Sequence, residues 1–202
     1  IQPSDLVSVE PKVKALFFGG ISLAVEPCAD TYAELLDREG AGRAVMIDPN
    51  IRPGFIADEK AYRARMAKMF AKADIVKVSD EDLQWIVPGD DTMDERAMKI
   101  IDQGPALVLL TRGGEGADAY VTSGHKLSVA AEKAEVVDTV GAGDTFNAGV
   151  LAKLAELGVL TKAKVRNLSL EDAALALAFG AKVAGVTVAR AGANPPWASE
   201  LT

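Results

Sequence analysis

Cysteine and histidine are almost missing from this chain of 202 residues, since each occurs only once, as Cys28 and His125. A lone cysteine excludes a disulfide within the chain and is typical of a reducing compartment, so we expect a cytoplasmic location. Neither a zinc site made of several cysteines and histidines nor a Ser-His-Asp triad can be built from this sequence. We therefore expect Cys28 to be structural or incidental and His125 to be a solvated turn residue.

Positive charge is also in deficit, because 22 Lys and Arg residues face 29 Asp and Glu residues, for a formal net charge of −7. A nucleic-acid surface needs clustered cations, so we expect no nucleic-acid partner. No run of about 18 apolar residues predicts a membrane span, and we expect neither a signal peptide nor a membrane partner. The P-loop signature Gly-x-x-x-x-Gly-Lys-Ser/Thr is missing as well. An acidic protein of this kind can still bind a nucleotide through main-chain amides and a metal ion.

Short apolar segments alternate with segments of helical periodicity along the first half of the chain. Strands that are apolar along their whole length predict a parallel sheet covered by helices on both faces, an α/β fold. Behind them follow a predicted hairpin and two further helices, with no flexible linker, so one compact unit is expected. The predicted strands are 13–18, 44–47, 75–78, 107–110, 117–121 and 126–129, and the predicted helices are 30–39, 59–73, 80–86, 94–103, one that ends near 156, and 171–184.

Polar and glycine residues follow the predicted parallel strands. In such sheets ligands bind at the carboxyl ends of the strands, so these residues predict a binding site along one rim. They are Gly19-Gly20, Asp48-Pro49-Asn50, Ser79-Asp80 and Thr111-Arg112-Gly113.

The stretch from Asp138 to Gly149 reads DTVGAGDTFNAG. Gly141 and Gly143 allow a tight turn whose amides point at one spot, and a helix behind them adds unsatisfied N–H groups and the positive end of its dipole. Such a site favours phosphate. Asp144 would repel that phosphate unless it has a task, such as taking a proton from an incoming hydroxyl. The alternative is that Asp144 caps the helix and the glycines only form the turn.

This string closely resembles the C-terminal signature of the ribokinase-like (PfkB) carbohydrate kinases, especially the bacterial fructokinase and 2-keto-3-deoxygluconate kinase branches. The resemblance implies a ribokinase-like fold, with residues 1–202 as the C-terminal two-thirds of a kinase domain and the family's N-terminal third and lid absent from this chain. It implies that Asp144 is the catalytic base. It also implies that the amides of Gly141, Ala142, Gly143 and Asp144 form the anion hole for the transferred phosphoryl group.

The stretch Asp48-Pro49-Asn50-Ile51-Arg52 follows a predicted strand. Its residue types also suit a solvated turn. The stretch resembles the Asp-Pro-Asn-x-Arg motif of the same two branches, which implies that Asp48, Asn50 and Arg52 bind the substrate, with the guanidinium on anionic oxygens.

Ser79 and Asp82 match, with a departure, the Asn-x-x-Glu motif of many ribokinase relatives. The resemblance implies that Ser79 contacts the nucleotide and that Asp82 helps to organise Mg²⁺ through water. The alternative is that Ser79 caps a helix whose acidic first turn suits the helix dipole, and both interpretations can hold together.

The loop Thr111-Arg112-Gly113-Gly114-Glu115-Gly116 resembles the family's nucleotide loop, although any strand-to-hairpin loop can be rich in glycine. The stretch 186–197 resembles a fructokinase element beside the adenine, where Trp197 either packs on the base or shields the loop. The nucleotide-binding set implied by the resemblance is Ser79, Thr111, Gly113, Gly116, Asn147 and Asn194.

Asp138 is either a turn residue or, by resemblance, part of a monovalent-cation (K⁺) site together with the carbonyl of Val140. The resemblance therefore implies an ATP- and Mg²⁺-dependent kinase that phosphorylates a primary hydroxyl of a small sugar, with fructose first and 2-keto-3-deoxygluconate second. A nucleotide-binding fragment without turnover and a nucleoside kinase remain alternatives. A homodimer formed through the lid is the expected assembly.

Overall fold

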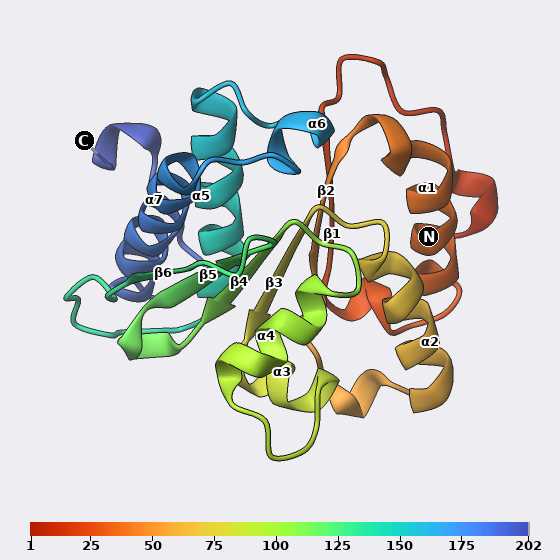
Figure 1. Cartoon of the computed structure of the whole chain (residues 1–202), viewed down its shortest axis with the longest axis horizontal. Coiled ribbons are helices and arrows are strands. Elements are labelled where there is room, and N and C mark those ends of the chain that lie inside the picture. Colours follow the sequence, from red (N-terminus) through yellow and green to blue (C-terminus); the bar gives the residue numbers. More distant parts are fainter. Residues whose placement is uncertain (202) are drawn as a thin grey trace. The chain divides into compact units, whose positions relative to one another are not determined.

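The computed structural model describes residues Ile1–Leu201 and contains a six-stranded, mostly parallel sheet with the strand order β1-β2-β3-β4-β5-β6 (Figure 1). β1 pairs with β2 and β2 with β3 in parallel, while β5 and β6 flank the tight turn that contains His125. The predicted α/β fold is therefore confirmed. The strands are β1 (Ala15–Gly19), β2 (Ala44–Asp48), β3 (Ile75–Ser79), β4 (Leu107–Thr111), β5 (Ala117–Val121) and β6 (Lys126–Val129).

Every helix predicted from periodicity is present, with ends that differ by a few residues at most. One helix of a single turn, α6, was missed because four residues carry no detectable periodicity. The helices are α1 (Cys28–Glu39), α2 (Glu59–Phe70), α3 (Asp80–Ile86), α4 (Met93–Ile101), α5 (Ala142–Glu156), α6 (Lys162–Val165) and α7 (Leu170–Val188). Within Ile1–Leu201, no helix combines the length and the hydropathy that crossing a membrane requires.

The chain divides into two compact units, where the sequence predicts one. The first unit comprises 1–110, 120–125 and 161–167, and the second comprises 111–119, 126–160 and the residues from Leu168 on. The chain passes between the units several times, so no single stretch of linker composition marks their boundary. That is why the division could not be predicted.

The core of the first unit is built from strand residues and the apolar faces of helices. Tyr62, Met66, Met69 and Phe70 are all buried, which confirms the apolar stripe predicted for α2. They belong to one cluster with residues of the first four strands, such as Val45 of β2. Burying each side chain of this size contributes roughly 1.5–3 kcal/mol.

Asp74 fastens α6 to the first unit. Its fully buried carboxylate lies 2.8 Å from Nζ of Lys162 and 3.1 Å from Nη1 of Arg166, and it also accepts the amide of Val45 at 2.9 Å. A buried charge needs such partners, because an unpaired one carries a large desolvation penalty. Two ion pairs therefore explain why residues 161–167 belong to the first unit although both neighbouring segments belong to the second.

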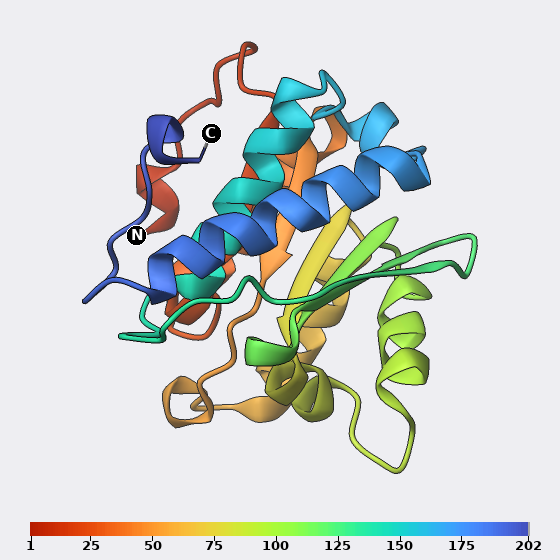
Figure 2. The ribbon, with the colours of Figure 1, turned by 90° about the vertical axis from the view of Figure 1, so that its left-hand side faces the viewer.

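In the second unit, α5 and α7 pack against each other (Figure 2). A Cβ at Gly149 would lie 3.0 Å from the Cα of Gly180, and a Cβ at Gly180 would lie 2.7 Å from Cγ2 of Val150. Two glycines thus let the helix backbones approach closely where side chains would hold them apart. This contact positions the first turn of α5 relative to α7.

Candidate active site

The turn before α5 has the conformation that its glycines predict. Gly141 is the N-cap residue with φ of +80° and ψ of 0°, in the left-handed region that glycine adopts without strain. A Cβ there would also lie 3.0 Å from the Cβ of Ala193. Gly141 therefore satisfies two demands, a positive φ and a close neighbour, and the helix begins directly behind it at Ala142.

Most amides of this turn are available for a ligand. The N–H of Ala142 donates to the carbonyl of Thr139 at 3.2 Å, whereas within residues 1–201 the amides of Gly141, Gly143 and Asp144 have no acceptor. Three unsatisfied donors at the positive end of a helix of 15 residues are an arrangement that suits an anion.

The side chain of Asp144 is exposed at the same helix end. Among the residues that the structure describes, no donor bonds to its carboxylate, and α5 has no side-chain cap. The alternative that Asp144 serves as the helix cap is therefore not what the geometry shows. A carboxylate without a structural partner is free to accept a proton from an incoming group.

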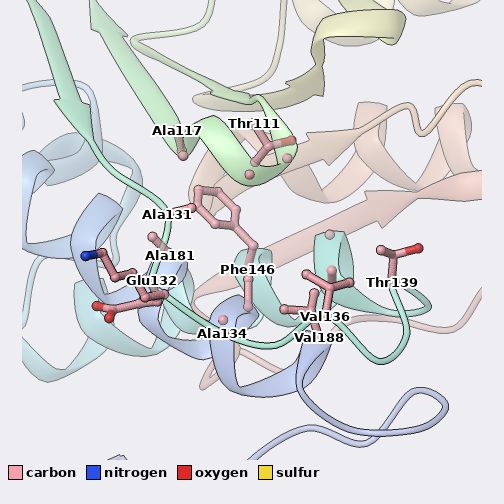
Figure 3. Close-up of a pocket in the computed structure, with 18 residues that line it drawn as sticks. Thr111, Ala117, Ala131, Glu132, Ala134, Val136, Thr139, Phe146, Ala181 and Val188 are labelled. Atoms are coloured by element: carbon pink, nitrogen blue, oxygen red, sulfur yellow. The ribbon is translucent and has the colours of Figure 1, made fainter.

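A pocket of about 450 Å³ opens beside this turn, wholly within the second unit. Its walls are mostly apolar, and Ala142 and Gly143 of the turn form part of them. In Figure 3, the ring of Phe146 projects from α5 into the space between the loop that carries Thr111 and the segment that carries Val136. An apolar slot that borders an anion site suits a ligand with a flat base and a phosphate.

The glycine loop after β4 supplies the opposite wall. Thr111, Gly113, Gly114 and Gly116 line the pocket, so the structure brings three predicted nucleotide-binding residues together with the turn before α5. The N–H of Arg112 donates to the carbonyl of Gly116 at 2.8 Å, which closes the loop at its base.

Asp138 joins the turn to the loop that follows α7. Its Oδ1 accepts the amide of Val140 at 3.0 Å and its Oδ2 accepts the amide of Gly192 at 2.9 Å. These hydrogen bonds, that of Val140 first, lower the pKa of the Asp138 carboxyl below its usual value. Asp138 is thus a turn residue that also fixes a second loop.

Three residues of the predicted nucleotide-binding set, Ser79, Asn147 and Asn194, do not line the pocket, and neither does Trp197. Asn147 is buried on α5, while Asn194 is exposed and its N–H donates to the carbonyl of Gly192 at 2.8 Å. Trp197 is 78% exposed. An indole this exposed does not shield the loop, and its packing on a base stays a prediction.

The residues predicted to bind the acceptor lie in the first unit. Asp48 is buried 3.2 Å from Nζ of the buried Lys77, and it accepts the amide of Asn50, which has a φ of +39°. Arg52 is exposed, with Nη1 donating to the carbonyl of Ile51 at 2.9 Å. The Asp48 carboxylate therefore holds the conformation of the loop after β2, and Arg52 lies at the exposed end of that loop.

Ser79 and Asp82 form the capping box at the start of α3. The Ser79 hydroxyl accepts the amide of Asp82 at 3.0 Å, and Asp82 accepts the amides of Ser79 at 3.2 Å and of Ile51 at 2.8 Å. The capping interpretation is thereby confirmed.

Burial raises the pKa of Tyr62, and the charges of Asp82 and Asp48 raise it further, so this phenol stays protonated.

No cluster of three or more His, Cys, Asp or Glu side chains that could hold a metal occurs among residues 1–201. A Mg²⁺ ion held mainly by nucleotide phosphates and water does not need such a cluster.

Sequence reasoning missed the far wall of the pocket. One face of α7 contributes Ala181, Ala184, Gly185 and Val188, and the irregular segment after β6 contributes residues between 131 and 136. The spacing i, i+3, i+4, i+7 places these small residues on one side of a helix, which is the signal that could have found them. A Cβ at Gly185 would lie 2.6 Å from Cβ of Glu132, so the segment rests directly on the helix.

A parallel sheet and a glycine turn with free amides define an α/β protein that can bind an anion at a helix N-terminus. Residues 5–200 match the family described as pfkB family carbohydrate kinase, and the chain belongs to this family.

Fructokinases are prominent among its relatives. The chain is 50% identical over 169 residues to a fructokinase of Rhizobium leguminosarum bv. trifolii, a match covering 83% of this chain and 51% of that protein. It is 30% identical over 204 residues to fructokinase-2 of Solanum lycopersicum, covering 99% of this chain and 60% of that protein. The chain thus spans about half the length of the curated relatives it matches.

Solved structures share the fold. A fructokinase double mutant from Vibrio cholerae O395, crystallised with fructose, ADP and potassium ion, superposes with a TM-score of 0.80 at 25% identity, over 96% of this chain and 59% of that chain. A ribokinase from Thermotoga maritima, at 20% identity and a TM-score of 0.69, shows the same fold over 93% of this chain and 55% of that chain. The ribokinase-like fold expected from the sequence is confirmed.

Proposed function

We propose that this chain is the nucleotide-binding and catalytic part of an ATP-dependent sugar kinase that phosphorylates fructose. The observation that carries the proposal is the exposed Asp144 carboxylate at the same helix end as three free amides, beside an apolar pocket. A protein that only binds a nucleotide gains nothing from a carboxylate facing phosphate, whereas a phosphotransferase needs a base there.

In this proposal the base of ATP enters the slot lined by Phe146 and α7, and its phosphates extend toward the turn before α5. The amides of Gly141, Gly143 and Asp144 stabilise the negative charge on the transferred phosphoryl group. The Asp144 carboxylate takes the proton of a primary sugar hydroxyl as its oxygen attacks the γ-phosphorus, and ADP leaves from the opposite side. Thr111, Gly113 and Gly116 hold the phosphates from the other wall.

Mg²⁺ would neutralise charge on the phosphates. Asp82 remains our prediction for a water-mediated contact to it, since both carboxylate oxygens already accept amides and direct ligation would compete with them. Asp138 with the carbonyl of Val140 remains our prediction for a monovalent cation, and potassium ion in the Vibrio cholerae fructokinase supports it. Half-buried Asp138 has a depressed pKa, which suits a carboxylate that stays charged beside a cation.

Fructose is the proposed acceptor because the relatives at 30–50% identity are fructokinases. Exposed Arg52 beside the Asp48 loop is the group that would meet the sugar or its transferring phosphate. In a 2-keto-3-deoxygluconate kinase, Arg52 would instead meet the carboxylate of the acceptor.

The test is ADP release, measured with a coupled assay across fructose, 2-keto-3-deoxygluconate, ribose and adenosine, together with ATP binding by calorimetry. We expect fructose to give the highest kcat/KM, and Asp144→Asn to lose at least about 10²-fold in kcat, the order of a general base, with ATP binding retained. Unchanged turnover in Asp144→Asn rejects the base, and ATP binding without turnover on any acceptor leaves a nucleotide-binding fragment. The matched control is Asp172→Asn, an acid in the first turn of α7 that bonds to Ser169.

That the chain is the C-terminal two-thirds of a kinase domain stays a prediction, and the matches to the two fructokinases cover 51% and 60% of those proteins. A homodimer through the lid and a cytoplasmic location stay predictions. Light scattering of the protein tests the first of these.

A further inference from the structure

A cluster of charged residues lies beside the nucleotide loop but outside the pocket lining. Its centre is Asp118 of β5, which is only 1% exposed. The Arg112 guanidinium approaches both carboxylate oxygens, with Nε 3.1 Å from Oδ2 as an ion-pair contact and Nη2 donating to Oδ1 at 3.3 Å. Ser128 Oγ donates to Oδ1 at 2.6 Å, and Lys126 Nζ lies 3.3 Å from Oδ2.

Arg112 is also the residue that closes the glycine loop. Its N–H donates to the carbonyl of Gly116, and its own carbonyl accepts the amide of Glu115 at 3.0 Å. Its Nη1 lies 2.7 Å from Glu115 Oε2, but that acid is largely exposed, so the buried Asp118 is the stronger anchor. One side chain therefore connects the base of the loop to the sheet.

The other end of the loop is fixed at Gly116, where the surrounding backbone leaves no room for a side chain. Gly116 has φ of +104°, and a Cβ there would collide with the carbonyl of Val129. Between these two anchors lie Gly113 and Gly114, which have no neighbour close to a Cβ position and line the pocket together with Thr111. Neither glycine has a side chain that could hold it in place, so the order of this wall depends on the anchors.

We propose that Asp118 is a positioning residue for nucleotide binding, which orders the Gly113–Gly116 loop by holding Arg112 at its base and keeps that guanidinium out of the pocket. This inference rests on the proposed nucleotide site. A loop that is ordered before the ligand arrives binds it without a further entropy cost, so Asp118 acts on affinity for the nucleotide. It lies outside the pocket lining, so it leaves the chemical step unchanged.

The experiment uses Asp118→Asn, with Asp74→Asn as the matched control. Asp74 is likewise a buried carboxylate held by one lysine and one arginine, but it belongs to the first unit and fastens α6. We expect Asp118→Asn to raise the Kd and the KM for ATP roughly tenfold with kcat changed less than about twofold, and to speed amide hydrogen exchange at 113–116. Asp74→Asn should lower the melting temperature and leave these values unchanged.

Arg112→Gln provides the second variant, which keeps the test decisive should Asp118→Asn fail to fold, since Arg112 is partly exposed. Because Asp118 acts on the loop through Arg112, we expect the double variant to bind ATP no more weakly than the weaker single variant. Asp118→Glu, which keeps the charge, should restore much of the affinity. Equal ATP affinity and equal loop exchange in the Asp118→Asn and wild-type proteins would overturn the inference. If the wild-type protein binds ATP without turnover and Asp118→Asn binds ATP more weakly, the kinase proposal is refuted and the inference about Asp118 stands.

Discussion

The carboxylate of Asp82 accepts a hydrogen bond from the main-chain N–H of Ile51 at 2.8 Å, although the two residues are 31 positions apart. Its other oxygen accepts the amide of Ser79 at 3.2 Å. A single side chain, 5% exposed, therefore connects the loop after β2 with the first turn of α3. Through this connection a capping residue controls where the exposed Arg52 stands.

Replacing Asp82 should damage the loop more than the helix. In Asp82→Asn an amide NH₂ replaces one acceptor, so a buried N–H loses its partner, which costs about 1–3 kcal/mol of unfolding free energy. We expect urea unfolding to show this loss and the KM for the acceptor sugar to rise more than the KM for ATP. The control is Glu81→Gln, which removes an exposed charge from the same helical turn. Equal changes in unfolding free energy and in KM for Asp82→Asn and Glu81→Gln would mean that Asp82 acts only on the helix dipole and not on the loop.

The ionisation of Asp138 should make the stability of the folded protein depend on pH in a defined direction. In the folded protein, the pKa of the Asp138 carboxyl lies below its usual value of 3.8. The stability that this carboxylate contributes is therefore complete above the pKa of the unfolded state, and it is lost as the pH falls through the pKa of the folded state. We expect the difference in melting temperature between wild-type protein and Asp138→Asn to be constant above about pH 5 and to shrink below it. The change should coincide with faster hydrogen exchange at the amide of Gly192. A difference that grows with acidity would contradict the assignment.

Gly185→Ala should narrow the pocket. The new Cβ would lie 2.6 Å from Cβ of Glu132, close to that residue's backbone, so the segment that carries Val136 must shift. We expect a several-fold higher KM for ATP, although glycine to alanine inside a helix otherwise stabilises by about 0.5–1 kcal/mol. Gly54→Ala, in open space, is the control. Should both variants bind ATP like the wild-type protein, the segment after β6 is not a wall of the nucleotide site.

Gly180→Ala should weaken the packing of α5 on α7. Its Cβ would lie 2.7 Å from Cγ2 of Val150 and 3.0 Å from the carbonyl of Phe146, and a backbone atom cannot move aside as a side chain can. Overpacking of this kind costs about 1–3 kcal/mol, which denaturant unfolding measures. The companion variant Val150→Ala, combined with Gly180→Ala, should recover part of the loss because it removes one of the two clashes. No recovery would mean that the Phe146 carbonyl dominates.

Strand and helix positions were largely predictable because they depend on local hydrophobic pattern. Both strands of the hairpin and all of α3 lie where the pattern predicts them. The single turn of α6 was not predictable, since its place depends on the buried Asp74, which lies far away in the sequence. The partner of Asp82 in the loop after β2 could not be predicted for the same reason.

By itself, the sequence determined the α/β fold, the family and the glycine turn before α5, because these follow from residue types at short spacing. Only the tertiary structure decided which amides of that turn remain free, that α7 and the segment after β6 close the pocket, and that Asp118 holds Arg112. Each of these depends on contacts between residues distant in the chain. Side-chain identity states what a residue can do, and its neighbours after folding decide which of those possibilities remain.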